Sequence, residues 1–346
     1  MQRVCLALSI VFWLGLPGPA SAEAVDHAKG VTGHWARTAD GLSIWYETEG
    51  EGVPIVLISG GPGASHNALH LTHHALAHYG KLVFVDNRGR GRSDRAKGPR
   101  AYTIENDVLD LEAVRQSLGV ERWIVYGRSY GGMVAQAYAI AHPQRVLGLI
   151  VSNSLDGAAS WEKYNIENVK RYLEDQFPEQ WERIASLHEQ GYVSSQDTLA
   201  AQFRNLGELY SASPENDSLF RAQSTIFRDP ERVSHNREVY ECMVGPDPDW
   251  AVEGTLEDVE LAEGLADVHC PALVLAGRYD RITPPAAQRI IANALPQARL
   301  VMFERSGHRP EFEESARWLR VVGGFLEEVL SAPPPGPPLD PPPAAR

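Results

Sequence analysis

Short apolar runs alternate with longer amphipathic stretches along most of the chain. Residues 55–58, 82–85, 123–126 and 146–152 are almost wholly apolar, as is typical of strands that are buried on both faces of a parallel sheet. Residues 105–118 repeat apolar side chains at helical spacing. Strands that alternate with helices in this way predict an α/β fold, with a mostly parallel central sheet and helices on both faces.

The predicted sheet begins with a hairpin and continues near the end of the chain. Residues 34–37 and 42–47 flank a glycine turn, which predicts two antiparallel strands. Residues 273–276 and 300–303 are again short and apolar, and residues 311–330 have the pattern of a closing helix. We therefore expect the sheet to resume after a long interruption.

The interruption, residues 154–262, is charged, aromatic and helix-patterned over 161–177, 181–190 and 198–210. It holds 22 Asp and Glu residues against nine Lys and Arg, whereas the whole chain has a net charge of −13. Nearly all of the excess negative charge therefore falls here. The segment predicts an acidic helical cap that would concentrate cationic substrates, although a solvated helical surface explains most acidic runs equally well.

The two ends of the chain have different compositions from the rest. Arg3, a 13-residue apolar run and the sequence Ala20-Ser-Ala22 predict a cleaved signal peptide and a secreted or periplasmic protein. A retained membrane anchor is the alternative, but a span needs about 20 apolar residues. The tail is rich in proline, which predicts disorder. The expected organisation is a signal peptide (1–22), a first core part (23–153), the cap (154–262), a second core part (263–330) and the tail (331–346).

Ser129 lies in the run Gly127-Arg-Ser-Tyr-Gly131, between an apolar strand and an alanine-rich helix. The G-x-S-x-G spacing is typical of a nucleophile elbow, in which the serine occupies a strained turn from strand to helix. The helix behind it directs its N-terminal N–H groups towards developing negative charge. The pattern predicts a nucleophilic Ser129, and a glycine-rich turn without chemistry is the alternative.

Two further residues complete a candidate triad. Asp280 follows the strand at 273–276, and His308 follows the strand at 300–303 on a glycine turn. Serine, acid and histidine in this order are typical of α/β-hydrolases. His308 would take the proton of Ser129, and Asp280 would orient the imidazole. Asp156 is a second candidate for the acid.

A glycine-rich loop predicts the oxyanion hole. The run Ser59-Gly-Gly-Pro-Gly63 follows a buried strand, and glycines allow backbone N–H groups to turn towards a substrate carbonyl. We expect the N–H of Gly61, with Gly60 as the alternative, to act together with the N–H of Tyr130.

These motifs resemble the proline iminopeptidases, which are serine exopeptidases of the α/β-hydrolase fold. The resemblance rests on the glycine-proline-glycine loop, the segment from Asp86 to Ser93, the elbow around Ser129 and Ser306-Gly-His308. It covers roughly residues 35–153 and 265–330. Two positions depart from the family pattern: Ser59 stands where a histidine is usual, and Tyr130 where many members carry tryptophan. The cap carboxylates that hold the substrate's amino group in the family have no clear match here.

The resemblance implies an aminopeptidase that releases N-terminal proline or small residues from peptides. Glu238 and Glu241, three residues apart on an expected helix, are the candidate ligands of the substrate's amino group. A carboxylesterase or other small-ester hydrolase is the alternative activity. A binding protein that retains the hydrolase fold without catalysis is a more remote one. No cofactor is expected.

The remaining motifs are interpreted as structural. His66, His70, His74 and His78 recur at a spacing that can bind a metal on a helix, but without an accompanying glutamate we expect surface or partly packed histidines and no metal. Cys242 and Cys270 could pair in an oxidising compartment or remain free thiols. The overall acidity argues against nucleic-acid binding, so the basic cluster is interpreted as a loop anchored by ion pairs: Arg88, Arg90, Arg92, Arg95, Lys97 and Arg100.

Overall fold

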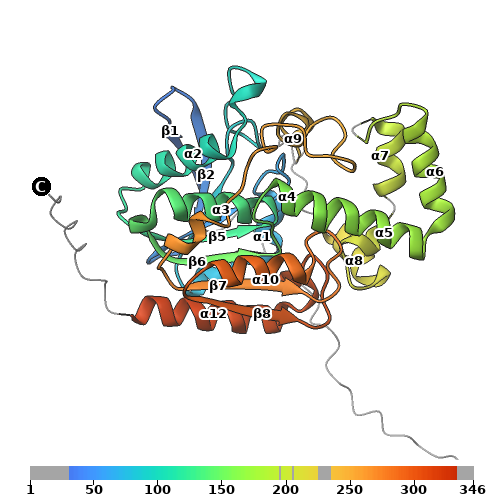
Figure 1. Cartoon of the computed structure of the whole chain (residues 1–346). Helices are drawn as coiled ribbons and strands as arrows, with labels where there is room; N and C mark the ends of the chain where they lie inside the picture. The colour runs from blue at the N-terminus through green and yellow to red at the C-terminus, as the bar shows by residue number, and fades with distance from the viewer. Residues whose placement is uncertain (1–30, 195, 205, 225–234, 333–346) are drawn as a thin grey trace, which may run out of the picture.

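The protein forms an α/β structure around one sheet of eight strands (Figure 1). The computed structural model describes residues 31–332 apart from 195, 205 and 225–234. The strand order is β1-β2-β4-β3-β5-β6-β7-β8, with antiparallel pairing of β1 with β2 and of β2 with β4, and parallel pairing beyond. The strands are β1 (Thr32–Arg37), β2 (Ser43–Glu49), β3 (Pro54–Ile58), β4 (Lys81–Val85), β5 (Trp123–Arg128), β6 (Val146–Ser152), β7 (Ala272–Gly277) and β8 (Ala298–Phe303).

Helices cover both faces of this sheet (Figure 1). These helices are α1 (Asn67–His73), α2 (Ile104–Ser117), α3 (Tyr130–Ala141), α10 (Pro285–Ala294), α11 (Pro310–Glu313) and α12 (Ser315–Ser331). Leu111 of α2, Met133 of α3 and Ile291 of α10 belong to one buried cluster, whereas Leu69 of α1 and Trp318 of α12 belong to a second cluster. The predicted α/β class with a mostly parallel, doubly covered sheet is confirmed.

A helical segment lies between β6 and β7. Its helices are α4 (Ala158–Ser160), α5 (Glu167–Gln176), α6 (Pro178–Glu189), α7 (Asp197–Arg204), α8 (Pro214–Ser224) and α9 (Arg237–Val244), and residues 161–166 form a π-helix. Leu173, Ile184, Leu199 and Leu209 form an apolar cluster of their own. In Figure 1, α5 to α8 lie beyond one end of the sheet.

Two predicted helices are interrupted. The helix expected over residues 198–210 ends at Arg204, and Gly207 packs so closely that an added Cβ would lie 2.1 Å from a carboxylate oxygen of Asp217. The helix expected over residues 311–330 is divided at Glu314. The Glu314 side chain accepts hydrogen bonds from the backbone N–H of Arg305 and the hydroxyl of Ser306. Tertiary contacts therefore override the local helical pattern at both positions.

Cysteines, histidines and the ends of the chain were each the subject of a prediction from the sequence. The two cysteines of the described residues, Cys242 and Cys270, are both free. The expectation of surface or partly packed histidines is wrong for His66 and His70, which are buried. The predicted signal peptide and most of the predicted tail lie outside the described residues. Within the described part of the chain, no helix combines the length and the apolarity needed to cross a bilayer.

The basic loop after β4 is held by buried ion pairs, as expected. The Arg88 guanidinium donates to Asp110, with a shortest distance of 2.7 Å. The Arg90 guanidinium donates to both carboxylate oxygens of Asp107 at 2.6 and 2.9 Å, and also to the carbonyl of Pro62 at 2.7 Å. The pair of Arg90 with Asp107 therefore ties α2 to the glycine-rich loop after β3.

Replacing Arg90 by methionine is expected to lower the free energy of unfolding by about 3–5 kcal/mol, because Asp107 would remain buried without its cation. Arg95→Met provides the control, since Arg95 pairs with Glu238 at the surface and exposed pairs contribute at most about 1 kcal/mol. Urea unfolding of both variants measures the difference. Equal losses in the two variants would contradict this description of the loop.

Candidate active site

Ser129 occupies the turn between β5 and α3, with φ 54° and ψ −127°. A positive φ is rare for a residue with a side chain and requires support from its surroundings. The Ser129 N–H donates to the carbonyl of Ser152 at 2.9 Å, and the hydroxyl of Ser154 donates to the carbonyl of Ser129 at 2.7 Å. Both contacts come from the end of β6 and the residues after it, so the neighbouring strand holds the turn.

The glycines on either side of Ser129 are required by packing. A Cβ on Gly127 would lie 2.0 Å from the carbonyl oxygen of Gly131, and a Cβ on Gly131 would lie 2.2 Å from that of Ile58. Backbone atoms cannot move aside as a flexible side chain can. Glycine at both positions therefore lets β5, α3 and the end of β3 approach one another this closely.

Asp280 and His308 meet although they follow different strands. The Nδ1–H of His308 donates to Oδ2 of Asp280 at 2.8 Å, and both side chains are buried. The backbone N–H of His308 donates to the carbonyl of Tyr210 at 2.7 Å, which connects the histidine loop to the helical segment. With Nδ1 engaged in this way, Nε2 is the nitrogen that remains to accept a proton.

Further hydrogen bonds hold the carboxylate of Asp280. The side chains of Asn153 and Thr283 donate to Oδ2 at 2.8 and 2.7 Å, and the N–H groups of Ile282 and Thr283 donate to Oδ1, each at 2.9 Å. Burial raises the pKa of Asp280, but His308 and these donors outweigh it and leave the pKa below its usual value. Asp280 is therefore an anion at neutral pH. Sequence reasoning missed Asn153 and Thr283, because neither lies in a recognisable motif.

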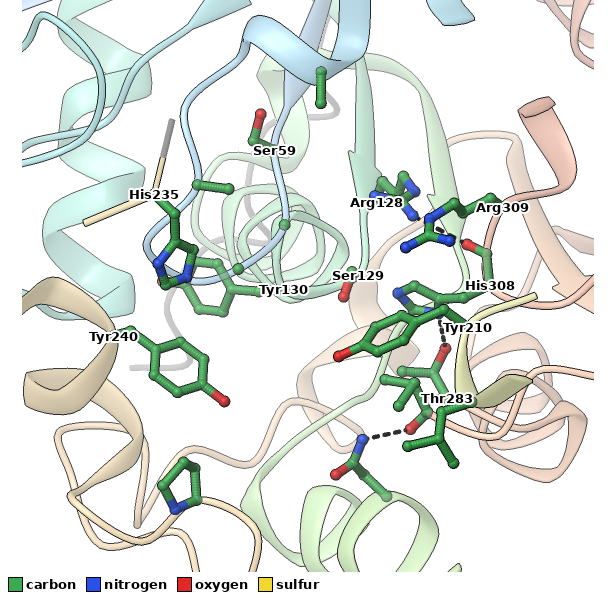
Figure 2. A pocket seen from close by; sticks show the side chains of 18 of the residues that line it. Ser59, Arg128, Ser129, Tyr130, Tyr210, His235, Tyr240, Thr283, His308 and Arg309 are labelled. Carbon is green, nitrogen blue, oxygen red and sulfur yellow. Dashed lines mark hydrogen bonds between the residues drawn. The ribbon is translucent and has the colours of Figure 1, made fainter. Parts of the chain in front are cut away.

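One cavity of about 630 Å³ brings these residues together. Ser129, His308 and Thr283 line it from the ends of the strands, and residues of the helical segment line its other side. Figure 2 shows the Ser129 side chain beside the ring of His308. Asp156, the second candidate for the acid, instead accepts a hydrogen bond from the hydroxyl of Ser160.

The expected oxyanion residues also line this cavity. Gly60, Gly61 and Tyr130 all belong to its wall. Gly61 has a φ of 125° and precedes a cis peptide bond to Pro62. Gly60 approaches Ser129 so closely that an added Cβ would lie 2.9 Å from the Cβ of Ser129. The glycine-rich loop therefore lies directly against the serine turn.

The structure places Glu238 and Glu241 away from this cavity, and neither is among its lining residues. Glu238 pairs with Arg95 at 2.9 Å, and Glu241 pairs with Arg237 on its own helix. Their three-residue spacing puts them on one face of α9, but that face is turned to neighbouring arginines and solvent. The expectation that they hold the substrate's amino group is corrected accordingly.

Two tyrosines and the half-buried carboxylate of Asp249 contribute polar groups to the cavity on the helical side. Figure 2 shows the hydroxyls of Tyr210 and Tyr240 pointing into the cavity, and neither hydroxyl has a hydrogen-bond partner among the described residues. Asp249 lines the same cavity and forms no ion pair with arginine or lysine in the described part of the chain. Burial raises the pKa of Asp249 to about 6. The other lining carboxylate, Asp217, is paired with Arg221 and Arg309.

Comparison with known proteins agrees with this architecture. The model of the α/β-hydrolase fold family matches residues 53–315. The chain belongs to this family. A proline iminopeptidase of Saccharolobus solfataricus is 32% identical over 303 residues, which cover 84% of this hydrolase and 91% of that relative.

Solved structures give the same result. The proline iminopeptidase of Mycobacterium smegmatis superposes with a TM-score of 0.68 at 25% identity, covering 86% of this hydrolase and 98% of that chain. The structure of VinJ superposes with a TM-score of 0.72 at 26% identity, covering 86% of this hydrolase and 99% of that chain. The resemblance of this hydrolase to the proline iminopeptidases is thus confirmed over most of the chain.

Gly60→Ala is expected to slow covalent labelling of Ser129 by a fluorophosphonate at least about tenfold, because the new methyl group would displace the serine and the loop against it. Gly98→Ala is the matched control, since a Cβ on Gly98 meets nothing within 4 Å. Labelling rates of the two folded variants are compared with wild type. Undiminished labelling of Gly60→Ala would contradict the close approach of loop and serine.

Proposed function

We propose that this hydrolase is an exported aminopeptidase that releases N-terminal proline or small residues from peptides through Ser129, His308 and Asp280. The hydrogen bond of His308 to the buried Asp280 carries the proposal, since His308 lines the same cavity as Ser129, which is held on a strained turn. The resemblance to proline iminopeptidases supports the peptide substrate. The apolar N-terminal run and its Ala-Ser-Ala end support export.

In the proposed reaction, Ser129 Oγ bonds to the carbonyl carbon of the first residue while Nε2 of His308 takes the hydroxyl proton. The imidazolium is stabilised by Asp280, whose carboxylate is already charged and held by Asn153 and Thr283. His308 then gives the proton to the departing amine as the C–N bond breaks. Water deprotonated by His308 releases the acyl group and restores Ser129.

Negative charge develops on the carbonyl oxygen during both steps. We assign its stabilisation to the backbone N–H groups of Gly61 and Tyr130, because both residues line the cavity beside Ser129 and Tyr130 opens α3. The N-terminus of α3 adds a favourable dipole at the same place. One such donor typically contributes about 3–4 kcal/mol to the lowering of the barrier.

The free amino group of the substrate is assigned to Asp249, Tyr210 and Tyr240. Asp249 is the lining carboxylate that no arginine neutralises among the described residues, and its charge raises the pKa of both neighbouring tyrosines further, beyond the effect of burial. The Asp249 carboxylate, to which Ser194 also donates, and the two tyrosine hydroxyl oxygens can accept the N–H groups of an ammonium ion. This set replaces Glu238 and Glu241.

The Ser129→Ala variant is expected to lose at least about 10³-fold in turnover of a proline arylamide, since the covalent step needs the hydroxyl. The wild-type enzyme should cleave this substrate with a free amino group much faster than the same arylamide with a blocked one. Release of the arylamine is followed by absorbance. A short-chain aryl ester serves as the comparison, and faster cleavage of the ester with no preference for a free amine would favour the esterase alternative.

The Asp249→Asn variant is expected to raise KM for the free-amine arylamide about 10- to 100-fold, because a charged hydrogen bond contributes about 1.5–3 kcal/mol. Glu238→Gln is the control and should leave KM unchanged, as Glu238 lies outside the cavity.

The same carboxylate predicts a pH dependence. Asp249 is charged above pH 6 and becomes neutral as the pH falls through its raised pKa of about 6, so the preference of wild type for the free over the blocked amine should weaken below pH 6. Asp249→Asn should show a preference that does not change with pH in this range. A wild-type preference that stays constant down to pH 5 would contradict the assignment.

A further inference from the structure

Three side chains that can ligate a metal converge between β2 and α1, outside the substrate cavity. Glu47 comes from β2, and His66 and His70 lie one helical turn apart at the start of α1. Oε2 of Glu47 lies 3.2 Å from Nε2 of His66 and 3.0 Å from Nε2 of His70. All three residues are buried, and one ligand atom from each lies within 4.8 Å of the other two.

Neighbouring groups fix the orientation of these side chains. Nδ1 of His66 lies 2.7 Å from Oδ1 of Asp86, which directly follows β4. The ring of His70 stacks on Phe84 with centroids 3.8 Å apart, and the indole N–H of Trp45 donates to the second oxygen of Glu47 at 3.1 Å. A carboxylate on the far nitrogen of a histidine is the usual outer partner of a metal-binding imidazole, because it fixes the tautomer that leaves Nε2 free to ligate.

We propose that Glu47, His66 and His70 form a binding site for a divalent transition-metal ion, with zinc as its representative. Two imidazole nitrogens and one carboxylate oxygen are a donor set that zinc accepts. Ligands held about 2.0–2.1 Å from one ion in tetrahedral geometry are separated by about 3.3 Å. The two distances from Oε2 of Glu47 are already close to that separation, and the ligand atoms of the two histidines lie within 4.8 Å of each other.

The location gives the ion a structural role. None of its ligands lines the substrate cavity, but Ser65, the residue before His66, does. The carbonyl of Ser65 also accepts a hydrogen bond from the hydroxyl of Ser59 at 2.9 Å, at the start of the glycine-rich loop. A metal at His66 would therefore fix the end of this loop and the first turn of α1 to β2. The proposal is independent of the substrate and of the catalytic residues.

A metal-free cluster is the competing explanation for the same geometry. Burial opposes a charge on His66, but Asp86 and Glu47 outweigh it and raise the pKa of His66 to about 9. An imidazolium held between two carboxylates would then replace the ion. The two explanations differ in whether the cluster takes up zinc, which can be measured directly.

The test uses the full chain without an affinity tag, stripped with a chelator and then titrated with Zn²⁺ alone. Wild type is expected to bind one zinc ion in this site, and His70→Gln and Glu47→Gln are each expected to weaken binding at least about 100-fold. His78→Gln is the matched control, since His78 lies nearby but outside the cluster, and it should bind as wild type does. Calorimetry gives the affinity, and circular dichroism checks that each variant is folded.

X-ray absorption at the zinc edge of the zinc-loaded wild type tests the proposed ligands directly, even if both ligand variants misfold. Two imidazole ligands and oxygen donors in the first coordination sphere would support the site. Absence of zinc binding at micromolar concentration, a sphere with fewer than two imidazoles, or unchanged affinity in folded His70→Gln and Glu47→Gln would each overturn it. In those cases the cluster is the hydrogen-bonded imidazolium.

Discussion

The geometry of the site depends on one backbone constraint, the contact of the Ser129 turn with the end of β3. Carbonyl groups of residues 58 and 131 occupy the space where side chains of Gly131 and Gly127 would otherwise stand. This contact puts the serine, the glycine-rich loop and the first turn of α3 within one small volume. Because parallel strands end at a common edge of a sheet, the loops after β7 and β8 bring Asp280 and His308 to the same place.

The proposed catalytic chemistry at this edge of the sheet depends on the negative charge of Asp280. A carboxylate buried without partners would take up a proton, yet four donors from the loops after β6 and β7 and the ring of His308 keep Asp280 ionised. The same bonds hold the imidazole in the tautomer that can accept a proton at Nε2. The orientation of the proposed base is thus set by the packing of three strands rather than by the histidine loop alone.

The sheet, the elbow around Ser129 and the meeting of Asp280 with His308 could be predicted from the sequence, because local spacing and chain order carry that information. It was not sufficient for groups that meet through tertiary packing. Glu238 and Glu241 have suitable spacing, but the rotation of α9 turns them towards Arg95 and Arg237. Glu47 reaches the histidines of α1 from a strand about 20 residues earlier in the sequence, and no local pattern indicates that approach.

The helical segment is acidic overall, but its net charge alone does not bind a substrate's amino group at a defined position. Among the described residues of the segment, most carboxylates are absent from the cavity wall, and of the two that line it, Asp217 is neutralised by arginines. Surface carboxylates act through water and salt, which screen them beyond about 8–10 Å, so they can raise the local concentration of a cation but cannot fix its position. A half-buried carboxylate such as Asp249 can act over a direct hydrogen bond, where water screens its charge less. In the proposed function, discrimination between a free and a blocked amine would therefore come from Asp249 and its neighbouring tyrosines.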